Sequence, residues 1–375
     1  MITINYLTQI EFGFGAVSQL QKLALNNSIN RPLIITDKGL VSLGVIENIK
    51  HALNDLVKVV IFDLTPSNPT ESAALLALEL YRDEGCDGLI AIGGGSSIDL
   101  AKAISILATH KGPLAQYAAI DGGGEKIGPV SPLIAIPTTS GTGSEVGRAT
   151  LITLNDGRKL GLISQNLIPK AAICDPELTL SLPPYLTAAT GLDAISHCIE
   201  TYLSPRVNPV ADAIALDGLV RAVGYIEKSV LNGNDRQSRW EMMMASLQGG
   251  LTFQKGLGAI HALSHPLGGL KNINLHHGTL NAIFLPAVLD FNKDCCKEKY
   301  RIIRERLNLD NDASLSNFFL NLNIRLGLPI KLRDIGVQDK DLEDISKAAI
   351  LDHSNPTNPR KCTIEDYLGI LKTVY

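Results

Sequence analysis

Histidine and aspartate residues in the second half of the chain carry the strongest chemical signal. Asp193 and His197 are four residues apart, and His261 and His265 repeat this spacing before His276-His277-Gly278. Residues four apart share one face of a helix. A single Asp–His pair is usually a local hydrogen bond, and a lone histidine on an apolar helix is usually a core residue. Two such pairs and a further histidine in one helical region favour a metal site. One aspartate and three histidines would suit Fe²⁺ or Zn²⁺.

Two glycine-rich segments are candidates for nucleotide binding. Gly93-Gly94-Gly95-Ser96 follows a strand-like run and opens a helical one, and the stretch from Pro137 to Glu145 is rich in hydroxyls and glycines after another such run. Glycine lets a backbone approach a ligand closely, and free N–H groups at a helix start attract phosphate. The first segment is not G-x-G-x-x-G, so the usual dinucleotide motif is absent. Each segment alone could be a structural turn; together they favour a nucleotide site.

Asp37 lies just after the first strand-like run. A carboxylate at this place can accept hydrogen bonds from both ribose hydroxyls, and it repels a 2′-phosphate, which would favour NAD over NADP. Asp37 could equally be the N-cap of a following helix.

The first half of the chain alternates short apolar runs with a helical stretch. Strands are predicted at 32–36, 57–62, 88–92 and 133–137, and a helix at 70–84. Such alternation is typical of a parallel sheet with helices on both faces. We therefore predict that residues 1–180 form an α/β dinucleotide-binding domain.

After Leu182-Pro183-Pro184 the pattern becomes helical and strand-like runs nearly vanish. Helices are predicted at 187–203, 209–231, 236–254 and 299–307. Residues 181–375 are therefore predicted to form an all-helical domain that carries the metal site.

Composition excludes several classes of protein. The net charge of −4 gives no indication of binding to nucleic acid or to an anionic membrane. No apolar run reaches the roughly 18 residues of a membrane span, and no signal peptide is evident at the N-terminus. The 6 cysteines form no Cys-x-x-Cys pair. We interpret them as reduced thiols in a cytoplasmic protein.

Four motifs in order resemble those of the iron-containing (group III) alcohol dehydrogenases. They are Gly93-Gly94-Gly95-Ser96 with Asp99 and Lys102, the Pro137–Glu145 stretch, Gly191-Leu192-Asp193 with His197, and His261 with His265-Pro266-Leu267-Gly268 and His277-Gly278. The resemblance extends from Phe12-Gly13 to Asn358-Pro359-Arg360. It implies a Rossmann-like N-terminal domain and an all-α C-terminal domain, the fold that dehydroquinate synthase shares, with the active site between the two domains.

The resemblance also implies which residues bind the cofactors. It assigns the metal, Fe²⁺ or alternatively Zn²⁺, to Asp193, His197, His261 and His277. His265 is expected beside the metal without binding it, where it could pass a proton to solvent or serve only in packing. The expected NAD contacts are Asp37, Asn68, Gly94, Gly95, Ser96, Asp99, Thr138, Thr139, Thr142, Lys159 and Leu178.

Some features depart from the family pattern. Ser97 stands where proline usually follows Gly-Gly-Gly-Ser, and the stretch from His265 to His277 is two residues longer than in propanediol-type relatives. The adjacent His276 leaves open which of the two histidines binds the metal.

A narrower resemblance concerns the substrate. Ser67–Glu71, Asp156–Gly161, Phe253–Gly258 and Leu275–Ala282 are similar to the 4-hydroxybutyrate dehydrogenases of this family. The expected reaction is hydride transfer between NAD(H) and a small primary alcohol or aldehyde, with 4-hydroxybutyrate and succinate semialdehyde as the best match. The alternative is a propanediol- or lactaldehyde-like substrate.

Two residues are predicted to contact the substrate. Phe253 belongs to the narrower resemblance, and Arg148 lies among small and apolar residues three positions after the second glycine-rich segment. A guanidinium can bind a carboxylate through two parallel hydrogen bonds. Arg148 could instead form a structural ion pair.

Two other functions stay open at this point: a lyase like dehydroquinate synthase, which would release no NADH, and a nucleotide-binding regulator without activity. The protein is expected to form a homodimer.

Overall fold

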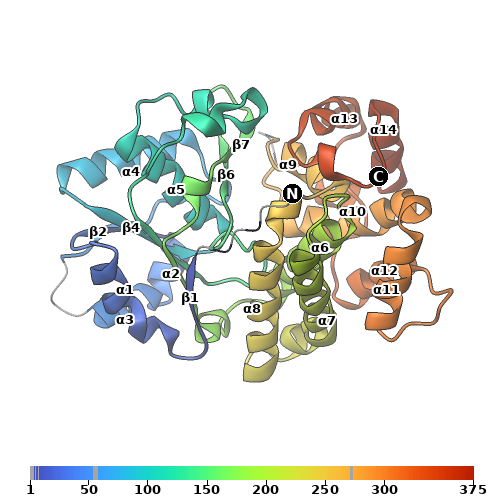
Figure 1. Ribbon diagram of the computed structural model, residues 1–375, viewed down its shortest axis with the longest axis horizontal. Helices are drawn as coiled ribbons and strands as arrows, with labels where there is room; N and C mark the ends of the chain where they lie inside the picture. The colour runs from blue at the N-terminus through green and yellow to red at the C-terminus, as the bar shows by residue number, and fades with distance from the viewer. Residues whose placement is uncertain (1–3, 5, 7, 54–57, 271–272) are drawn as a thin grey trace. The chain divides into compact units, whose positions relative to one another are not determined.

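The computed structural model describes residue 4, residue 6 and residues 8–53, 58–270 and 273–375. The chain divides into two compact units. The N-terminal unit comprises Tyr6–Thr139 and Ser144–Leu180, and the C-terminal unit includes Ser181–Tyr375 and Ser140–Gly143. The first is an α/β unit and the second is built from helices (Figure 1), which confirms the predicted fold class.

The N-terminal unit is built on a six-stranded parallel sheet with the strand order β1-β8-β5-β4-β2-β3. Its strands are β1 (Gln9–Phe12), β2 (Pro32–Ile35), β3 (Val60–Phe62), β4 (Gly88–Gly93), β5 (Leu133–Pro137) and β8 (Ala171–Cys174). Four of these lie at the predicted positions, although β3 begins at Val60, and Val57 lies outside the described residues. The edge strand β1 and strand β8 were not predicted.

Helices cover both faces of this sheet. They are α1 (Leu20–Asn26), α2 (Lys38–Ser42), α3 (Val45–Leu53), α4 (Glu71–Asp83) and α5 (Gly95–Thr109). Alternate strand residues enter different cores: Leu33 and Ile35 pack with residues of α4 and α5, whereas Ile34 packs with residues of α1 and α3. Successive side chains of a strand point to opposite faces of the sheet, and both faces are buried here. Each residue of such a strand is therefore apolar, which explains the continuous apolar runs in the sequence.

A hairpin of β6 (Ala149–Thr153) and β7 (Lys159–Ile163) was also not predicted. It is attached to α5 through polar groups. The fully buried Lys102 donates to the carbonyl oxygens of Ser144, Gly147 and Ala149 at 2.8–2.9 Å, and to Oγ of Ser144 at 3.0 Å. Local sequence could not show this attachment, because Lys102 lies 42 to 47 positions before the carbonyl groups that it binds.

The C-terminal unit contains the helices that carry the candidate metal ligands. Its helices are α6 (Pro184–Leu203), α7 (Pro209–Leu231), α8 (Arg236–Leu251), α9 (Ala259–Leu267), α10 (His277–Asn292), α11 (Lys297–Arg306), α12 (Leu315–Arg325), α13 (Leu342–Leu351) and α14 (Ile364–Thr373). Helix α6 is buried from Thr187 to Leu203. It begins three residues earlier than predicted, because proline is compatible with the first turn of a helix.

The short segment Ser140–Gly143 groups with the C-terminal unit, although the sequence boundary placed it in the N-terminal domain. Close backbone approach explains the difference. A Cβ atom on Gly141 would lie 2.7 Å from Cβ of Thr190, and one on Gly143 would lie 2.5 Å from Cα of Gly250. These two glycines therefore let the segment pack directly on α6 and α8.

Among the helices that the structure describes, none is both long and apolar enough to cross a membrane.

Candidate functional site

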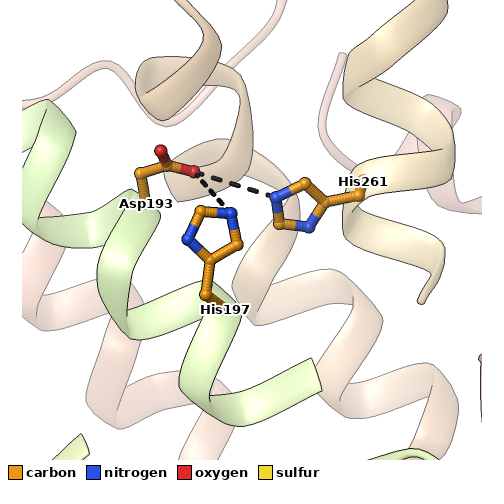
Figure 2. Close-up of side chains that lie close together, drawn as sticks. All are labelled: Asp193, His197 and His261. Atoms are coloured by element: carbon orange, nitrogen blue, oxygen red, sulfur yellow. Dashed lines mark ion pairs between the residues drawn. The ribbon is translucent and has the colours of Figure 1, made fainter. Parts of the chain in front are cut away.

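Three of the four predicted metal ligands form a buried cluster in the C-terminal unit. Asp193 and His197 lie one turn apart on α6, and His261 comes from α9 (Figure 2). Nε2 of His197 lies 3.5 Å from Oδ1 of Asp193, and Nε2 of His261 lies 3.8 Å from the same oxygen. The three residues are between 1% and 3% exposed. The i,i+4 spacing places the first pair, and the packing of α9 brings the third residue to it.

His277, the first residue of α10, completes the predicted set. Its Nε2 atom lies 3.7 Å from Oδ1 of Asp193. A tetrahedral ion with bonds of about 2.0–2.2 Å has ligand–ligand separations of about 3.3–3.6 Å. The separations of 3.5, 3.8 and 3.7 Å from Asp193 to the three histidines are close to this geometry. One carboxylate and three imidazoles are also a donor set that Fe²⁺ and Zn²⁺ accept, so the residues present fit a divalent metal.

His276 lies next to His277 but outside this cluster. It is exposed, it precedes the first turn of α10, and its Nδ1 atom lies 3.5 Å from Oγ1 of Thr279. The geometry therefore favours His277 as the ligand.

The second ring nitrogen of two candidate ligands is held by an oxygen atom. Nδ1 of His197 lies 3.2 Å from the carbonyl oxygen of Gly141. Nδ1 of His261 lies 2.6 Å from Oε2 of Glu200, whose other oxygen accepts the backbone N–H of Ile260 at 2.6 Å. Such contacts hold the proton on Nδ1 and direct the Nε2 lone pair toward a metal.

Glu200 was not among the residues predicted from sequence. A signal was present, since it lies seven residues after Asp193 and therefore on the same face of α6. What the spacing did not show is that its partner would be His261, which is 61 positions away.

Asn281 is a second functional candidate that sequence reasoning missed. It is fully buried one turn after His277, and its Nδ2 atom donates to Oδ1 of Asp193 at 2.7 Å. The same nitrogen lies 3.2 Å from Nε2 of His261 and 3.1 Å from Nε2 of His277. Its amide therefore fixes the carboxylate at the point where the imidazoles converge.

The charges in the cluster are mutually dependent. Burial alone would raise the pKa of Asp193, but the neighbouring histidines His197, His277 and His261 outweigh it and hold that pKa well below its usual range. Burial lowers the pKa of His197 to about 4. Asp193 is therefore an anion and His197 is neutral at pH 7, as metal binding requires. Burial acts to lower the pKa of His261, but Glu200 and Asp193 outweigh it and raise that pKa to about 9, so a metal has to displace a proton from His261.

His265 lies beside the cluster rather than in it. Its ring stacks on that of His277 with centroids 5.5 Å apart and an interplanar angle of 8°. Its Nδ1 atom lies 2.9 Å from Oδ2 of Asp352. It also stacks on His353, with centroids 5.2 Å apart and an interplanar angle of 15°. Asp352 and His353 were not predicted from sequence.

The two predicted substrate residues lie in different units. Phe253 meets the ring of His197 edge to face at 4.8 Å, so it borders the candidate metal ligands. Arg148 is half-buried at the residue before β6. Its carbonyl oxygen accepts the backbone N–H of Ser164, which ties its backbone to the residue after β7.

The predicted cofactor residues of the N-terminal unit gather at one edge of the sheet. Asp37 follows β2, Gly94-Gly95-Ser96 follows β4, Thr138-Thr139 follows β5, and Leu178 follows β8. These strands are neighbours and parallel, so their carboxyl ends meet along one edge. From β2 the chain continues to β3 on one side, whereas from β4 it continues to β5 on the opposite side. The topological switch point therefore lies between β2 and β4. Nucleotides bind at such a point in open α/β sheets.

The first glycine-rich segment has the geometry of a phosphate-binding turn. Gly94 is the N-cap of α5 and Gly95 begins the helix, and neither has a capping side chain among the described residues. Gly93 has φ of +149°, and a Cβ atom on Gly94 would already lie 3.5 Å from Thr139. Because no described side chain caps α5, the N–H groups of its first turn are available to a ligand.

The structure shows Asp37 in the capping role. Its Oδ1 atom accepts the backbone N–H of Leu40 at 3.1 Å, so Asp37 is the N-cap of α2. The capping bond uses one carboxylate oxygen, and a contact of the other with a ribose stays a prediction.

The remaining predicted contacts lie around α5 and the hairpin. Ser96 donates to the carbonyl oxygen of Ser67 at 2.5 Å, and Nζ of Lys159 donates to Oδ1 of Asn68 at 2.9 Å. Burial lowers the pKa of Lys159 to about 8. Asp99 is engaged on both oxygens, by Oγ of Ser144 at 2.7 Å and by the backbone of Leu151 at 3.0 Å.

Asp99 thus joins α5 to the hairpin, and its contact with NAD stays a prediction. Thr142 belongs to the short segment that groups with the C-terminal unit.

Comparison with known proteins agrees with this arrangement. Residues 8–176 match the model of the iron-containing alcohol dehydrogenases, and residues 187–375 match that of the C-terminal part of the same family. A 4-hydroxybutyrate dehydrogenase of Cupriavidus necator is 52% identical over 99% of each chain. A 1,3-propanediol dehydrogenase of Klebsiella pneumoniae is 34% identical over 97% of this chain and 96% of its own.

Solved structures show the same fold. A 1,3-propanediol oxidoreductase superposes with a TM-score of 0.92 at 33% identity over the whole of both chains. A sulfoacetaldehyde reductase of Bifidobacterium kashiwanohense, solved with NAD⁺, has a TM-score of 0.88 at 26% identity over 100% of this chain and 98% of its own. These matches cover both units and all four sequence motifs. The chain therefore belongs to the iron-containing alcohol dehydrogenase family, whose members are oxidoreductases that use NAD and iron.

Proposed function

We propose that this enzyme interconverts 4-hydroxybutyrate and succinate semialdehyde with NAD⁺ and NADH. The observation that carries the proposal is the 52% identity to a 4-hydroxybutyrate dehydrogenase over 99% of both chains, against 34% to the propanediol dehydrogenase. The sulfoacetaldehyde reductase among the solved relatives also has a substrate name that implies an anionic group on a short aldehyde.

Asp193, His197, His261 and His277 would hold the metal, which we expect to be Fe²⁺, with Zn²⁺ as the alternative. A bound divalent metal supplies Lewis-acid activation of the substrate oxygen. The protein's part is to present three imidazoles in the required tautomer and one charged carboxylate. Glu200 and Gly141 fix two of the imidazoles, His261 and His197, and Asn281 holds the carboxylate of Asp193.

The N-terminal unit would bind NAD at the switch point of its sheet. The N-terminus of α5 offers its free N–H groups to the pyrophosphate, and Asp37 accepts hydrogen bonds from the ribose. Because Asp37 carries a negative charge, it disfavours the 2′-phosphate of NADP. Asn68, Thr138, Thr139, Thr142, Lys159 and Leu178 are proposed to complete the contacts.

His265 is proposed as the group that receives the proton of the substrate hydroxyl during alcohol oxidation. Its Nδ1 atom is engaged by Asp352, so Nε2 is the nitrogen available to other groups. The stacked ring of His277 places it next to the candidate metal ligands. The parallel proposal for the substrate is that Phe253 borders its apolar carbons and Arg148 binds its carboxylate.

The test is a steady-state comparison of substrates with the purified, metal-loaded enzyme. Absorbance of NADH would be followed with 4-hydroxybutyrate, 1,3-propanediol and 1-butanol, and in the reverse direction with succinate semialdehyde. The proposal expects the highest kcat/KM with 4-hydroxybutyrate. A higher kcat/KM with 1,3-propanediol would replace it with a diol dehydrogenase.

A further inference from the structure

The carboxylate of Asp352 forms two hydrogen bonds, to a backbone N–H group and to an imidazole, and Nδ1 of His353 lies further away, 3.7 Å from Oδ1. Oδ2 lies 2.9 Å from Nδ1 of His265, and Oδ1 accepts the backbone N–H of Ser354 at 2.8 Å. His265 is 4% exposed, so the first contact is shielded from water. A backbone N–H can only donate, whereas an imidazole nitrogen can donate or accept.

These two bonds together determine the tautomer of His265. A carboxylate can only accept, so Nδ1 must carry the hydrogen and Nε2 must be the acceptor nitrogen. The bond from Ser354 holds the carboxylate plane, and the stacking of His265 on His277 and on His353 holds the ring plane. The ring is therefore constrained both in its orientation and in which nitrogen it exposes.

We propose that Asp352 is a positioning residue that holds His265 with Nε2 as the hydrogen-bond acceptor toward the substrate hydroxyl. The inference about catalysis rests on the function proposed above, but the inference about the tautomer does not. Asp352 acts only through His265 and is not proposed to touch substrate or metal.

The substitution Asp352→Asn tests this sharply because it keeps the size of the side chain and reverses one hydrogen bond. Its amide oxygen has to face the N–H of Ser354, since an amide nitrogen there would meet another donor. The amide nitrogen then faces His265 and donates to Nδ1. The hydrogen of the ring moves to Nε2, which stops being an acceptor. Asp352→Glu keeps the carboxylate and should keep the original tautomer.

The decisive measurement is the tautomer itself. Enzyme with ¹⁵N-labelled histidine would be loaded with diamagnetic Zn²⁺, and long-range ¹H–¹⁵N correlation spectra would be recorded; His265 is assigned by its loss in His265→Phe. We expect the Nδ1–H pattern in wild type and in Asp352→Glu, and the Nε2–H pattern in Asp352→Asn. This readout needs no substrate, so it separates failure of the inference from failure of the proposed function.

Kinetics with the best substrate of the panel supply the second measurement. Asp352→Asn should lower kcat by about 100- to 10,000-fold, by analogy with the wrong-tautomer effect in a catalytic triad. KM for NAD and metal content should not change, and Asp352→Glu should recover part of kcat. Asp235→Asn is the matched control, because Asp235 only caps α8 and asparagine is an equally good cap.

Three results would overturn the inference. The first is an Nε2–H pattern for His265 in the wild-type enzyme. The second is an unchanged tautomer in folded Asp352→Asn, whatever its activity. The third is a changed tautomer with wild-type kcat, which would show that His265 has no need of the orientation that Asp352 imposes.

Discussion

Oε2 of Glu200 lies 2.6 Å from Nδ1 of His261, and both side chains are at least 96% buried. The other oxygen of Glu200 accepts the N–H of Ile260, so the carboxylate cannot rotate without losing that bond. A carboxylate behind a histidine ligand fixes the ring and increases its basicity. This pair links α6 to α9 and orients one of the candidate metal ligands.

Glu200→Gln should therefore weaken metal binding without removing any ligand. The glutamine oxygen has to stay with the N–H of Ile260, so the amide N–H₂ faces Nδ1 of His261 and shifts the ring hydrogen to Nε2. We expect metal affinity to fall by about 10- to 100-fold. Competition with a chelator of known affinity measures this, and Glu343→Gln, at an exposed position of α13, is the control. Equal affinities in the two variants would exclude an orienting role for Glu200.

Removal of the metal should abolish turnover, and added Fe²⁺ or Zn²⁺ should restore it. His261→Ala should lose both bound metal and activity, because the three remaining ligands hold an ion poorly. Elemental analysis beside NADH production checks both quantities. Full activity in protein shown to be metal-free would contradict the assignment of Asp193 and the three histidines.

Asp37→Asn should raise kcat/KM for NADP relative to NAD. Asparagine caps a helix about as well as aspartate, so α2 should keep its N-cap while the negative charge near the ribose is removed. Asp37→Gly would remove both the negative charge and the capping side chain. Comparing the two variants therefore separates the effect of the charge on cofactor preference from the effect of the cap on α2. The prediction fails if the wild-type enzyme already uses both cofactors equally well.

Arg148→Ala should reduce kcat/KM for 4-hydroxybutyrate by about 2–4 kcal/mol in transition-state free energy, the cost of leaving one partner of a buried charge pair unpaired. Activity with the neutral 1-butanol should change little. Arg158→Ala is a matched control, since Arg158 forms an exposed ion pair with Asp156 at 2.7 Å and such pairs contribute little. Equal losses on both substrates would reject Arg148 as the carboxylate-binding residue.

Lys102→Met should destabilise the enzyme rather than change its substrate. The ammonium group donates to three carbonyl oxygens and one hydroxyl, and its loss leaves these buried acceptors unpaired. Each unpaired buried acceptor costs about 1–3 kcal/mol, so a clear fall in the free energy of unfolding is expected. Urea denaturation checks this against Lys111→Met, an exposed position in the same unit. Similar midpoints for the two variants would show that the buried network tolerates the loss.

The local sequence determined many of the strands and helices of this protein and some of its candidate metal ligands. Apolar runs bounded by glycine and proline located β2, β4 and β5, and helical spacing located α7 at its observed bounds, Pro209–Leu231. The same spacing placed Asp193 and His197 on one face of α6. These features depend on interactions between residues close in the chain, so a single sequence contains the information. The four motifs then identified the family, which the comparisons confirm.

Only the tertiary structure decided which strands pair and which side chains from distant segments come into contact. The edge strand β1 and the hairpin β6–β7 depend on pairing and burial rather than on a local pattern. Glu200 meets His261 across 61 positions, and Asp352 meets His265 across 87, because separate helices pack against each other. Spacing along the chain indicates which side chains share a helix face, but the oxygen behind each imidazole is set by the packing of that face against another segment.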